Sequence, residues 1–408
     1  MVRALLKRKL IRSAAAISIV LGLCALAHAA PKYKVLHSFV GSDGSGPYTG
    51  VILGQDGNLY GTTVGGGTGH CGRYACGTVF RLTPHANGGW TESVLHSFEN
   101  DGPDGADPYG SLIFDAAGNL YGTTTSGGAH HYGSAFEMVR TPSGWDESVI
   151  YSFPLPGGEC CPEAGLVMDD AGNLYGTAGA VFELSTASGG WKGKVLHRFT
   201  AHDDGSRPSG LILGASGNLY GTTSAGGVHG AGTVFELQKI AGEWKEQRLH
   251  NFPAFPKDGQ EPSGGVIFDG KGDLYSTTAL GGGTGCTLGC GSVYKLTPEA
   301  GGHWQETLLH TFGNGQNGSA PDGGVVLDKA GNLYGATAYG GNGCGCGVIY
   351  KLRKQPSGRF KYTVLHTFTG QDGAVPAGGL ILDDKGNLYG GTVLGGTTGN
   401  GVIFELTP

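Results

Sequence analysis

The chain has 408 residues, of which 81 are glycine and 15% are charged, and its formal net charge is −6. Such a glycine content, with no sustained spacing of 3.6 residues between apolar positions, excludes a mainly helical protein. The acidic balance and the lack of a basic stripe exclude nucleic acid as a partner.

Residues 1–29 have the pattern of a signal peptide. Five basic residues lie between Arg3 and Arg12, an apolar run follows, and Ala27-His28-Ala29 fits a cleavage site. A membrane anchor is the rival interpretation, but the run is shorter than the roughly 20 residues of a spanning helix. A lipoprotein signal at Cys24 is a second rival, although Leu23 is bulky for one. We therefore expect a secreted or periplasmic protein without a membrane span, carrying 22 basic and 33 acidic residues after cleavage.

The rest of the chain, residues 30–408, is one tandem-repeat domain. The segment typified by residues 210–237, GLILGASGNLYGTTSAGGVHGAGTVFEL, occurs seven times. The first residue of its central tripeptide recurs at intervals of 61, 54, 45, 55, 59 and 55 residues: Asn58, Asn119, Asn173, Asn218, Asp273, Asn332 and Asn387. A repeat of this kind overrides the domain count expected from length.

Each copy predicts four short strands. In the second copy these are residues 111–114, 119–124, 134–138 and 145–153. Asp115 is expected to cap the first hairpin, and Gly122 to allow close approach by a neighbouring sheet. Four antiparallel strands match one propeller blade, with the short apolar strand innermost and the Trp-led strand outermost. A solenoid is the main alternative, but its coils are shorter and lack hairpins.

The two ends of the domain complement each other. Residues 33–39 form a strand of the fourth type, whereas the last copy stops after a third-type strand at residues 401–406. If the first strand completes the last sheet, the ring closes with no unpaired blade. The prediction is therefore an all-β, seven-bladed propeller, monomeric, with the Asp-Gly-x-x-Pro links and the Gly-Gly loops on one face.

Eight cysteines remain after the leader, in close pairs. An even count in an exported chain favours disulfides over metal binding, because the spacings differ from those of zinc ribbons. Pairing within a loop and cross-pairing between the loops at 286–290 and 344–346 both stay open, since the two shortest spacings would strain a bond. The disulfide candidates are Cys71, Cys76, Cys160, Cys161, Cys286, Cys290, Cys344 and Cys346.

The motifs GNLYGTT, GTVFEL and VLHSF, with the Asp-Gly-x-x-Pro link, resemble the exported GloVer, or choice-of-anchor, repeat family over residues 33–408. The resemblance implies a propeller-like exported protein of uncharacterised activity that often carries a C-terminal anchoring segment. Because the sequence ends at Glu405-Leu406-Thr407-Pro408 without such a segment, attachment to the cell surface is not expected from the resemblance. The third copy departs from the repeat, because Ala178-Gly179-Ala180 replaces the usual loop.

One position breaks the regularity of the repeat. The residue after each link proline varies, and on the predicted strand order these residues ring the mouth of the central channel. They are Tyr48, Tyr109, Glu163, Ser209, Ser263, Asp322 and Ala377. Tyr48, Tyr109, Glu163 and Asp322 are candidate contacts for a polar ligand such as a sugar; ordinary drift at loop positions is the alternative.

Histidines recur on the outermost strand, one per copy, and are interpreted as structural because the ring would spread them apart. They are His37, His96, His197, His250, His310 and His366, with Tyr151 in the remaining copy. His70, His130 and His131 form a separate candidate ligand cluster on the loops of the first two copies. No cofactor or resident metal is predicted, since nucleotide, zinc-protease and calcium-loop motifs are absent.

The sequence therefore favours a binding or interaction module for an extracellular glycan or protein, and leans against an enzyme. The alternative is an extracellular polysaccharide hydrolase or lyase with Glu163 and Asp322 as acids, which must lie roughly 5 to 10 Å apart to act as a glycosidase pair. A third hypothesis, a quinoprotein dehydrogenase, rests only on the vicinal Cys160 and Cys161.

Overall fold

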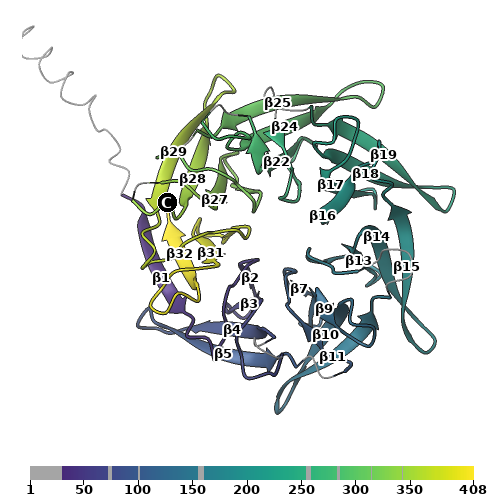
Figure 1. The fold of residues 1–408 in the computed structure, drawn as a ribbon, viewed down its shortest axis with the longest axis vertical. Coiled ribbons are helices and arrows are strands. Elements are labelled where there is room, and N and C mark those ends of the chain that lie inside the picture. Colours follow the sequence, from purple (N-terminus) through teal and green to yellow (C-terminus); the bar gives the residue numbers. More distant parts are fainter. Residues whose placement is uncertain are drawn as a thin grey trace, which may run out of the picture. The chain divides into compact units, whose positions relative to one another are not determined.

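The computed structural model describes residues 30–71, 76–99, 102–154, 160–253, 259–282, 285–313, 315–341 and 343–408. The predicted signal peptide lies outside these residues. Within them, seven four-stranded antiparallel sheets are arranged around a central axis, and no residue is helical (Figure 1). The predicted seven-bladed propeller is therefore confirmed. Among the described residues, there is also no helix of the length and apolarity that a membrane span requires.

The blades follow one another in chain order, and each is written here from its innermost to its outermost strand. Blade 1 is β2 (Val51–Leu53), β3 (Leu59–Thr63), β4 (Thr78–Pro84) and β5 (Trp90–Ser97); blade 2 is β7 (Ile113–Phe114), β8 (Leu120–Thr124), β10 (Ser134–Thr141) and β11 (Gly144–Ser152). Blade 3 is β12 (Val167–Met168), β13 (Leu174–Thr177), β14 (Ala180–Ala187) and β15 (Gly190–Arg198); blade 4 is β16 (Ser206–Leu213), β17 (Leu219–Ala225), β18 (Thr233–Ile240) and β19 (Glu243–Asn251). Blade 5 is β21 (Ile267–Phe268), β22 (Leu274–Thr278), β24 (Ser292–Pro298) and β25 (Trp304–Thr311); blade 6 is β26 (Val325–Leu327), β27 (Leu333–Thr337), β28 (Val348–Lys354) and β29 (Phe360–Thr367). Blade 7 is β30 (Ile381–Leu382), β31 (Leu388–Thr392), β32 (Val402–Thr407) and β1 (Lys32–Ser38).

An Asp-x-x-Gly-Asn turn builds the inner hairpin of blades 2, 3, 6 and 7, and variants with Gly54, Gly214 or Asp273 build those of blades 1, 4 and 5. In blade 2, Asp115 Oδ1 accepts hydrogen bonds from the amides of Ala117 at 2.9 Å and Asn119 at 2.8 Å. Gly118 has φ +89°, the left-handed conformation that glycine adopts without a steric penalty. The predicted capping role of Asp115 is confirmed, and Asn119 Nδ2 adds a bond to Asp115 Oδ2 at 2.8 Å.

The glycine of the Leu-Tyr-Gly-Thr-Thr strand has a different role from the one expected. Gly122 is paired with Phe136 of the next strand in its own blade, and a Cβ on Gly122 would clash with the Phe136 ring and the side chain of Leu112. The close approach is therefore made by an aromatic ring within the blade rather than by the backbone of a neighbouring sheet. Phe136 is fully buried as a result, and equivalent rings recur at Phe80 and Phe235.

The links between blades hold neighbouring blades together through the residue that precedes each proline. These residues all have φ between +53° and +67°: Gly46, Asp107, Cys161, Arg207, Glu261, Ala320 and Val375. Backbone strain at such positions costs about 1–3 kcal/mol each where the residue is not glycine. Six of the seven donate their amide to a carbonyl of the preceding blade at 2.8–3.1 Å, which offsets the strain.

The same links pair with the Gly-Gly loop of their own blade. In blade 2, β6 (Gly105–Ala106) pairs with β9 (Ser126–Gly127), and in blade 5, β20 (Gly259–Gln260) pairs with β23 (Leu280–Gly281). Single bridges replace these small sheets in three further blades, for example between Ser319 and Tyr339. The links and the Gly-Gly loops therefore lie on one face, as predicted.

The ring closes where the chain's two ends meet. β1 is the outermost strand of the sheet formed by β30, β31 and β32, and the Phe39 amide donates to the Gly401 carbonyl at 3.1 Å (Figure 1). Tyr33 packs on Phe404 with ring centroids 5.5 Å apart. The Gly46 amide also donates to the Asn400 carbonyl at 2.8 Å, so blade 7 and blade 1 have the same link contact as other neighbours. The predicted closure is therefore confirmed.

Candidate functional site

A cavity of about 860 Å³ lies at the axis of the ring. The link geometry determines its wall, because each strained link residue is followed by a proline and then by a residue that faces the axis. All seven variable positions line the cavity: Tyr48, Tyr109, Glu163, Ser209, Ser263, Asp322 and Ala377. The seven residues that the repeat singled out therefore line one cavity, whose size the sequence could not give.

Between these side chains the cavity wall is mostly backbone. Gly264, Gly265, Gly323, Gly378 and Gly379 all line it, and the apolar side chains of the innermost strands do not. Those side chains pack between blades instead, as Leu112 does in the core shared with Tyr60 and Phe136. The wall thus offers exposed peptide groups and few bulky side chains.

Two tyrosines from neighbouring blades form an aromatic corner of the cavity. The rings of Tyr48 and Tyr109 meet edge to face, with centroids 5.1 Å apart and an interplanar angle of 63°. Burial and nearby acids raise the pKa of both hydroxyls, with Asp322 the largest charged contribution at Tyr48 and Asp107 at Tyr109. Both phenols therefore stay protonated and can donate hydrogen bonds.

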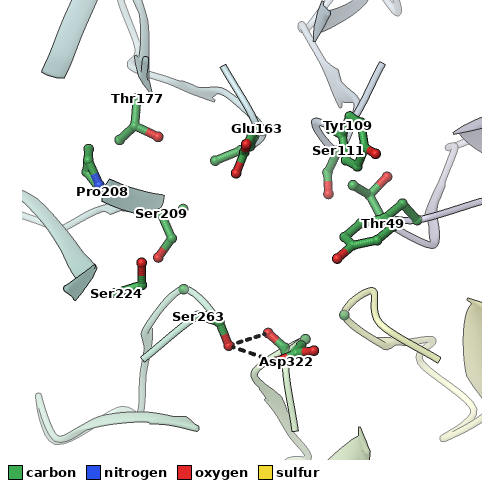
Figure 2. Close-up of a pocket in the computed structure, with 18 of the residues that line it drawn as sticks. Thr49, Tyr109, Ser111, Glu163, Thr177, Pro208, Ser209, Ser224, Ser263 and Asp322 are labelled. Atoms are coloured by element: carbon green, nitrogen blue, oxygen red, sulfur yellow. Dashed lines mark hydrogen bonds between the residues drawn. The ribbon is translucent and has the colours of Figure 1, made fainter. Parts of the chain in front are cut away.

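Asp322 is the acid most strongly affected by the cavity. Burial raises its pKa to about 6, and the Glu261 carboxylate adds to the effect. Ser263 Oγ, from the neighbouring blade, donates to Asp322 Oδ1 at 3.2 Å and partly counteracts it (Figure 2). A carboxyl group of this kind changes its charge near neutral pH.

Glu163 lies across the cavity from Asp322, and no hydrogen bond joins the two (Figure 2). Blade 3, which carries Glu163, is also where the repeat is shortened: only Ala178 and Gly179 separate β13 from β14. The wall there is completed by Cys160, Cys161 and Gly179. Both cysteines are unbonded, and burial together with the neighbouring thiol raises the pKa of Cys161 to about 11.

Sequence reasoning missed Arg207 and several hydroxyl groups of the cavity wall. Arg207 is the strained residue before Pro208, and its place in the repeat, where Cys161 stands one blade earlier, was the available signal. The missed hydroxyl-bearing residues are Thr49, Ser111, Thr177 and Ser224.

The histidines of the outermost strands are spread around the rim, as expected, and most have an acidic neighbour that the repeat analysis did not anticipate. His37 Nε2 lies 2.9 Å from Asp43 Oδ2, and His366 Nε2 lies 3.1 Å from Asp372 Oδ2. His70, His130 and His131 are exposed. No three-donor group of His, Cys, Asp and Glu among the described residues includes any of these last three.

The cysteines pair within their loops. The bonded pairs are Cys71 with Cys76, Cys286 with Cys290 and Cys344 with Cys346, with Cα atoms 5.2–5.3 Å apart. The open alternative of cross-pairing between the last two loops is not what the structure contains. Three disulfides suit an extracellular or periplasmic protein, because such bonds persist in oxidising compartments.

The chain resembles solved structures at low sequence identity, and the first of the three below supports the fold alone. A Bacteroides uniformis protein assigned as a 6-phosphogluconolactonase is 12% identical with a TM-score of 0.52, over 81% of this chain and 87% of its own. A Xanthomonas campestris gluconolactonase is 16% identical with a TM-score of 0.39, over 68% and 82%. PorZ, a surface component of the Porphyromonas gingivalis type-IX secretion system, is 15% identical with a TM-score of 0.49, over 90% and 48%.

No curated protein matches the chain in sequence. A family model does, in three consecutive segments, residues 23–180, 178–286 and 283–408, which together cover the whole ring. The strand pattern, the closure and this match agree, and the chain belongs to the Gloeobacter/Verrucomicrobia repeat family.

Proposed function

We propose that this protein is an exported binding module that takes a polar ligand, a carbohydrate first, in its central cavity. The observation that carries the proposal is that the seven positions at which the repeat varies all line one cavity. A scaffold whose strands and links repeat, and which varies at the positions that face a cavity, is the arrangement by which loops on a rigid frame acquire specificity. Export is proposed from the signal-peptide pattern of residues 1–29 and agrees with the three disulfides.

A sugar fits the chemistry of the wall. Aromatic rings such as Tyr48 and Tyr109 present an apolar face to the C–H side of a pyranose and a hydroxyl to its polar edge. Asp322 and Glu163 supply carboxylate acceptors, and the glycine-rich wall lets a ligand reach backbone amides and carbonyls. A protein loop with exposed hydroxyl and amide groups would use the same contacts and is the second ligand class.

The test is a glycan array, followed by calorimetric titration with each glycan that is retained. Tyr48→Ala and Tyr109→Ala should each weaken binding by roughly 10-fold or more, because each removes aromatic surface that a bound ligand would cover. Ile240→Ala is the control, since Ile240 is exposed at the far end of β18, away from the cavity. Absence of binding to every glycan would refute the sugar proposal, and equal binding by all variants would place the site outside the cavity.

The second candidate is a polysaccharide hydrolase or lyase. It is favoured by Asp322, because an acid with a pKa of about 6 in a cavity can both donate and accept a proton near neutral pH. Under this hypothesis Asp322→Asn should abolish product formation while leaving binding within a few fold, and Glu163→Gln should do the same. If a bound glycan is recovered uncleaved from the unmodified protein, the binding module remains and the enzyme hypothesis is rejected.

A further inference from the structure

Two junctions between blades at the outer rim each gather an imidazole and two carboxylates. One group is His37, Asp43 and Glu92, and the other is His96, Asp104 and Glu147. Within each group one donor atom from every residue lies within 4.8 Å of the others. All six residues are partly buried, and none belongs to the central cavity or to the proposed function.

The repeat supplies the three donors from three different elements. The histidine comes from the outermost strand of one blade, the aspartate from the link, and the glutamate from the outermost strand of the next blade. At the first junction these are β1, the link after it and β5; at the second they are β5, its link and β11. The first group therefore spans the point where the ring closes.

The aspartates are held in place by backbone amides. Asp43 Oδ1 accepts from the Val40 amide at 2.8 Å, and its Oδ2 lies 2.9 Å from His37 Nε2. Asp104 Oδ1 accepts from the Gly105 amide at 2.7 Å, and its Oδ2 from the Glu99 amide at 2.7 Å. Such contacts orient a carboxylate before any ligand arrives.

The glutamates supply a separate observation. Glu92 Oε1 and Glu147 Oε1 are each buried from solvent and have no hydrogen-bond partner in the structure. An unpartnered buried carboxylate oxygen costs free energy, and in proteins such atoms are paired or coordinate a metal. These two oxygens belong to the residues that complete the three-donor groups. Glu246 Oε1, at the same repeat position on β19, also lacks a hydrogen-bond partner, but among the described residues His197, Asp204 and Glu246 do not form a three-donor group.

Other junctions show what happens when the glutamate is absent. Four residues before the rim histidine, β29 carries Tyr362 and β1 carries Tyr33 in place of glutamate. Tyr362 stacks on His310 at 4.1 Å between centroids, and Tyr33 stacks on His366 at 3.7 Å. At these junctions an aromatic ring covers the imidazole, so stacking replaces the three-donor arrangement.

We propose that these two junctions each bind one divalent first-row transition-metal ion, with Zn²⁺ as the first candidate. One imidazole and two carboxylates suit Zn²⁺ or Mn²⁺ better than Cu⁺, which prefers sulfur, and three protein ligands leave room for water. Because the ligands come from successive blades, the ion links blade 7 to blade 1 and blade 1 to blade 2. The inferred role is to stabilise the ring near its closure.

The test uses the purified full-length protein, stripped with a chelator and titrated with Zn²⁺ by calorimetry, with Co²⁺ absorbance as a second readout. We expect two equivalents and a higher melting temperature with Zn²⁺ than without. Glu92→Gln and Glu147→Gln should each lose one equivalent, and the double variant should lose both and the increase in melting temperature.

Two controls separate these sites from weaker surface binding. His310→Ala removes a rim histidine that lacks the carboxylate pair, and Glu243→Gln removes an exposed carboxylate on β19. Both should retain two equivalents. Circular dichroism establishes that each variant is folded, so loss of binding is not mistaken for unfolding. Two equivalents in the Glu92→Gln/Glu147→Gln variant, or none in the unmodified protein, would overturn the proposal.

Discussion

The ring of Tyr151 occupies the space above Gly193 at the junction between blades 2 and 3. A Cβ added to Gly193 would lie 2.5 Å from Tyr151 Cζ. One junction earlier, His96 is at the position of Tyr151 and Glu147 is at the position of Gly193. The larger tyrosine ring therefore occurs together with a glycine, which leaves room for it. The two positions act as a complementary pair across the junction.

Gly193→Ala should therefore destabilise the protein by about 1–3 kcal/mol, the usual range for adding a methyl group to a packed site. Combining it with Tyr151→Ala, which removes the obstructing ring, should cost less than the sum of the two single changes. Urea unfolding of the four proteins measures this coupling. Additive losses would show that the two residues do not interact.

Because the N-terminal strand closes the ring, shortening the side chain of Phe39, which follows that strand, should lower the free energy of unfolding. Phe39 and Phe98 occupy the same position in successive blades, and both are fully buried. Phe39→Ala and Phe98→Ala should each cost about 3–5 kcal/mol, because each leaves a large cavity. Thermal or denaturant unfolding would measure both losses. A Phe39→Ala loss far below that of Phe98→Ala would indicate that the N-terminal strand contributes little to the ring.

The aromatic packing inside a blade can be tested at Gly122, with Gly270 as the control position. Alanine at Gly122 would meet the ring of Phe136, whereas alanine at Gly270 would have no atom within 4 Å. We expect Gly122→Ala to lower the free energy of unfolding by about 1–3 kcal/mol and Gly270→Ala to change it by less than about 0.5 kcal/mol. Similar losses for both would place the cost in the backbone rather than in the contact with Phe136.

The raised pKa of Asp322 predicts that the stability of the protein depends on pH. Its pKa is about 6 in the folded protein and near 4 in an unfolded chain, so the folded state binds the proton more tightly. Its contribution to stability is therefore fully present below about pH 4 and is lost as the pH rises through about 6. The change is at most about 3 kcal/mol, from a shift of about two pKa units.

Asp322→Asn isolates this contribution from those of other acids. The difference in unfolding free energy between the variant and the unmodified protein should grow in favour of the variant from pH 4 to pH 7. Urea unfolding at intervals of one pH unit measures it. A difference that stays constant with pH would mean that Asp322 titrates normally in the folded protein.

The sequence alone was enough to predict the architecture, because the pattern of strands and turns that forms one blade recurs seven times. The Asp-x-x-Gly-Asn turns, the apolar first strand and the Trp-led fourth strand each follow from local chemistry, as the amides of Ala117 and Asn119 on Asp115 illustrate. The missing fourth strand of the last copy and the extra strand at the start determined the closure. The seven variable residues of the cavity wall also followed, since Tyr48 and Asp322 occupy one repeat position, whereas Arg207 and the wall's other hydroxyl groups did not.

Only the tertiary structure decided which side chains from different blades meet. Glu92 and His37 are 55 positions apart, and neither local pattern predicts that their donor atoms share a site. The strained residues before the prolines, the contact of Phe136 with Gly122 and the raised pKa of Asp322 were equally out of reach. Periodicity determines the shape of a blade, but contacts, burial and charge between blades depend on how the finished blades pack around the axis.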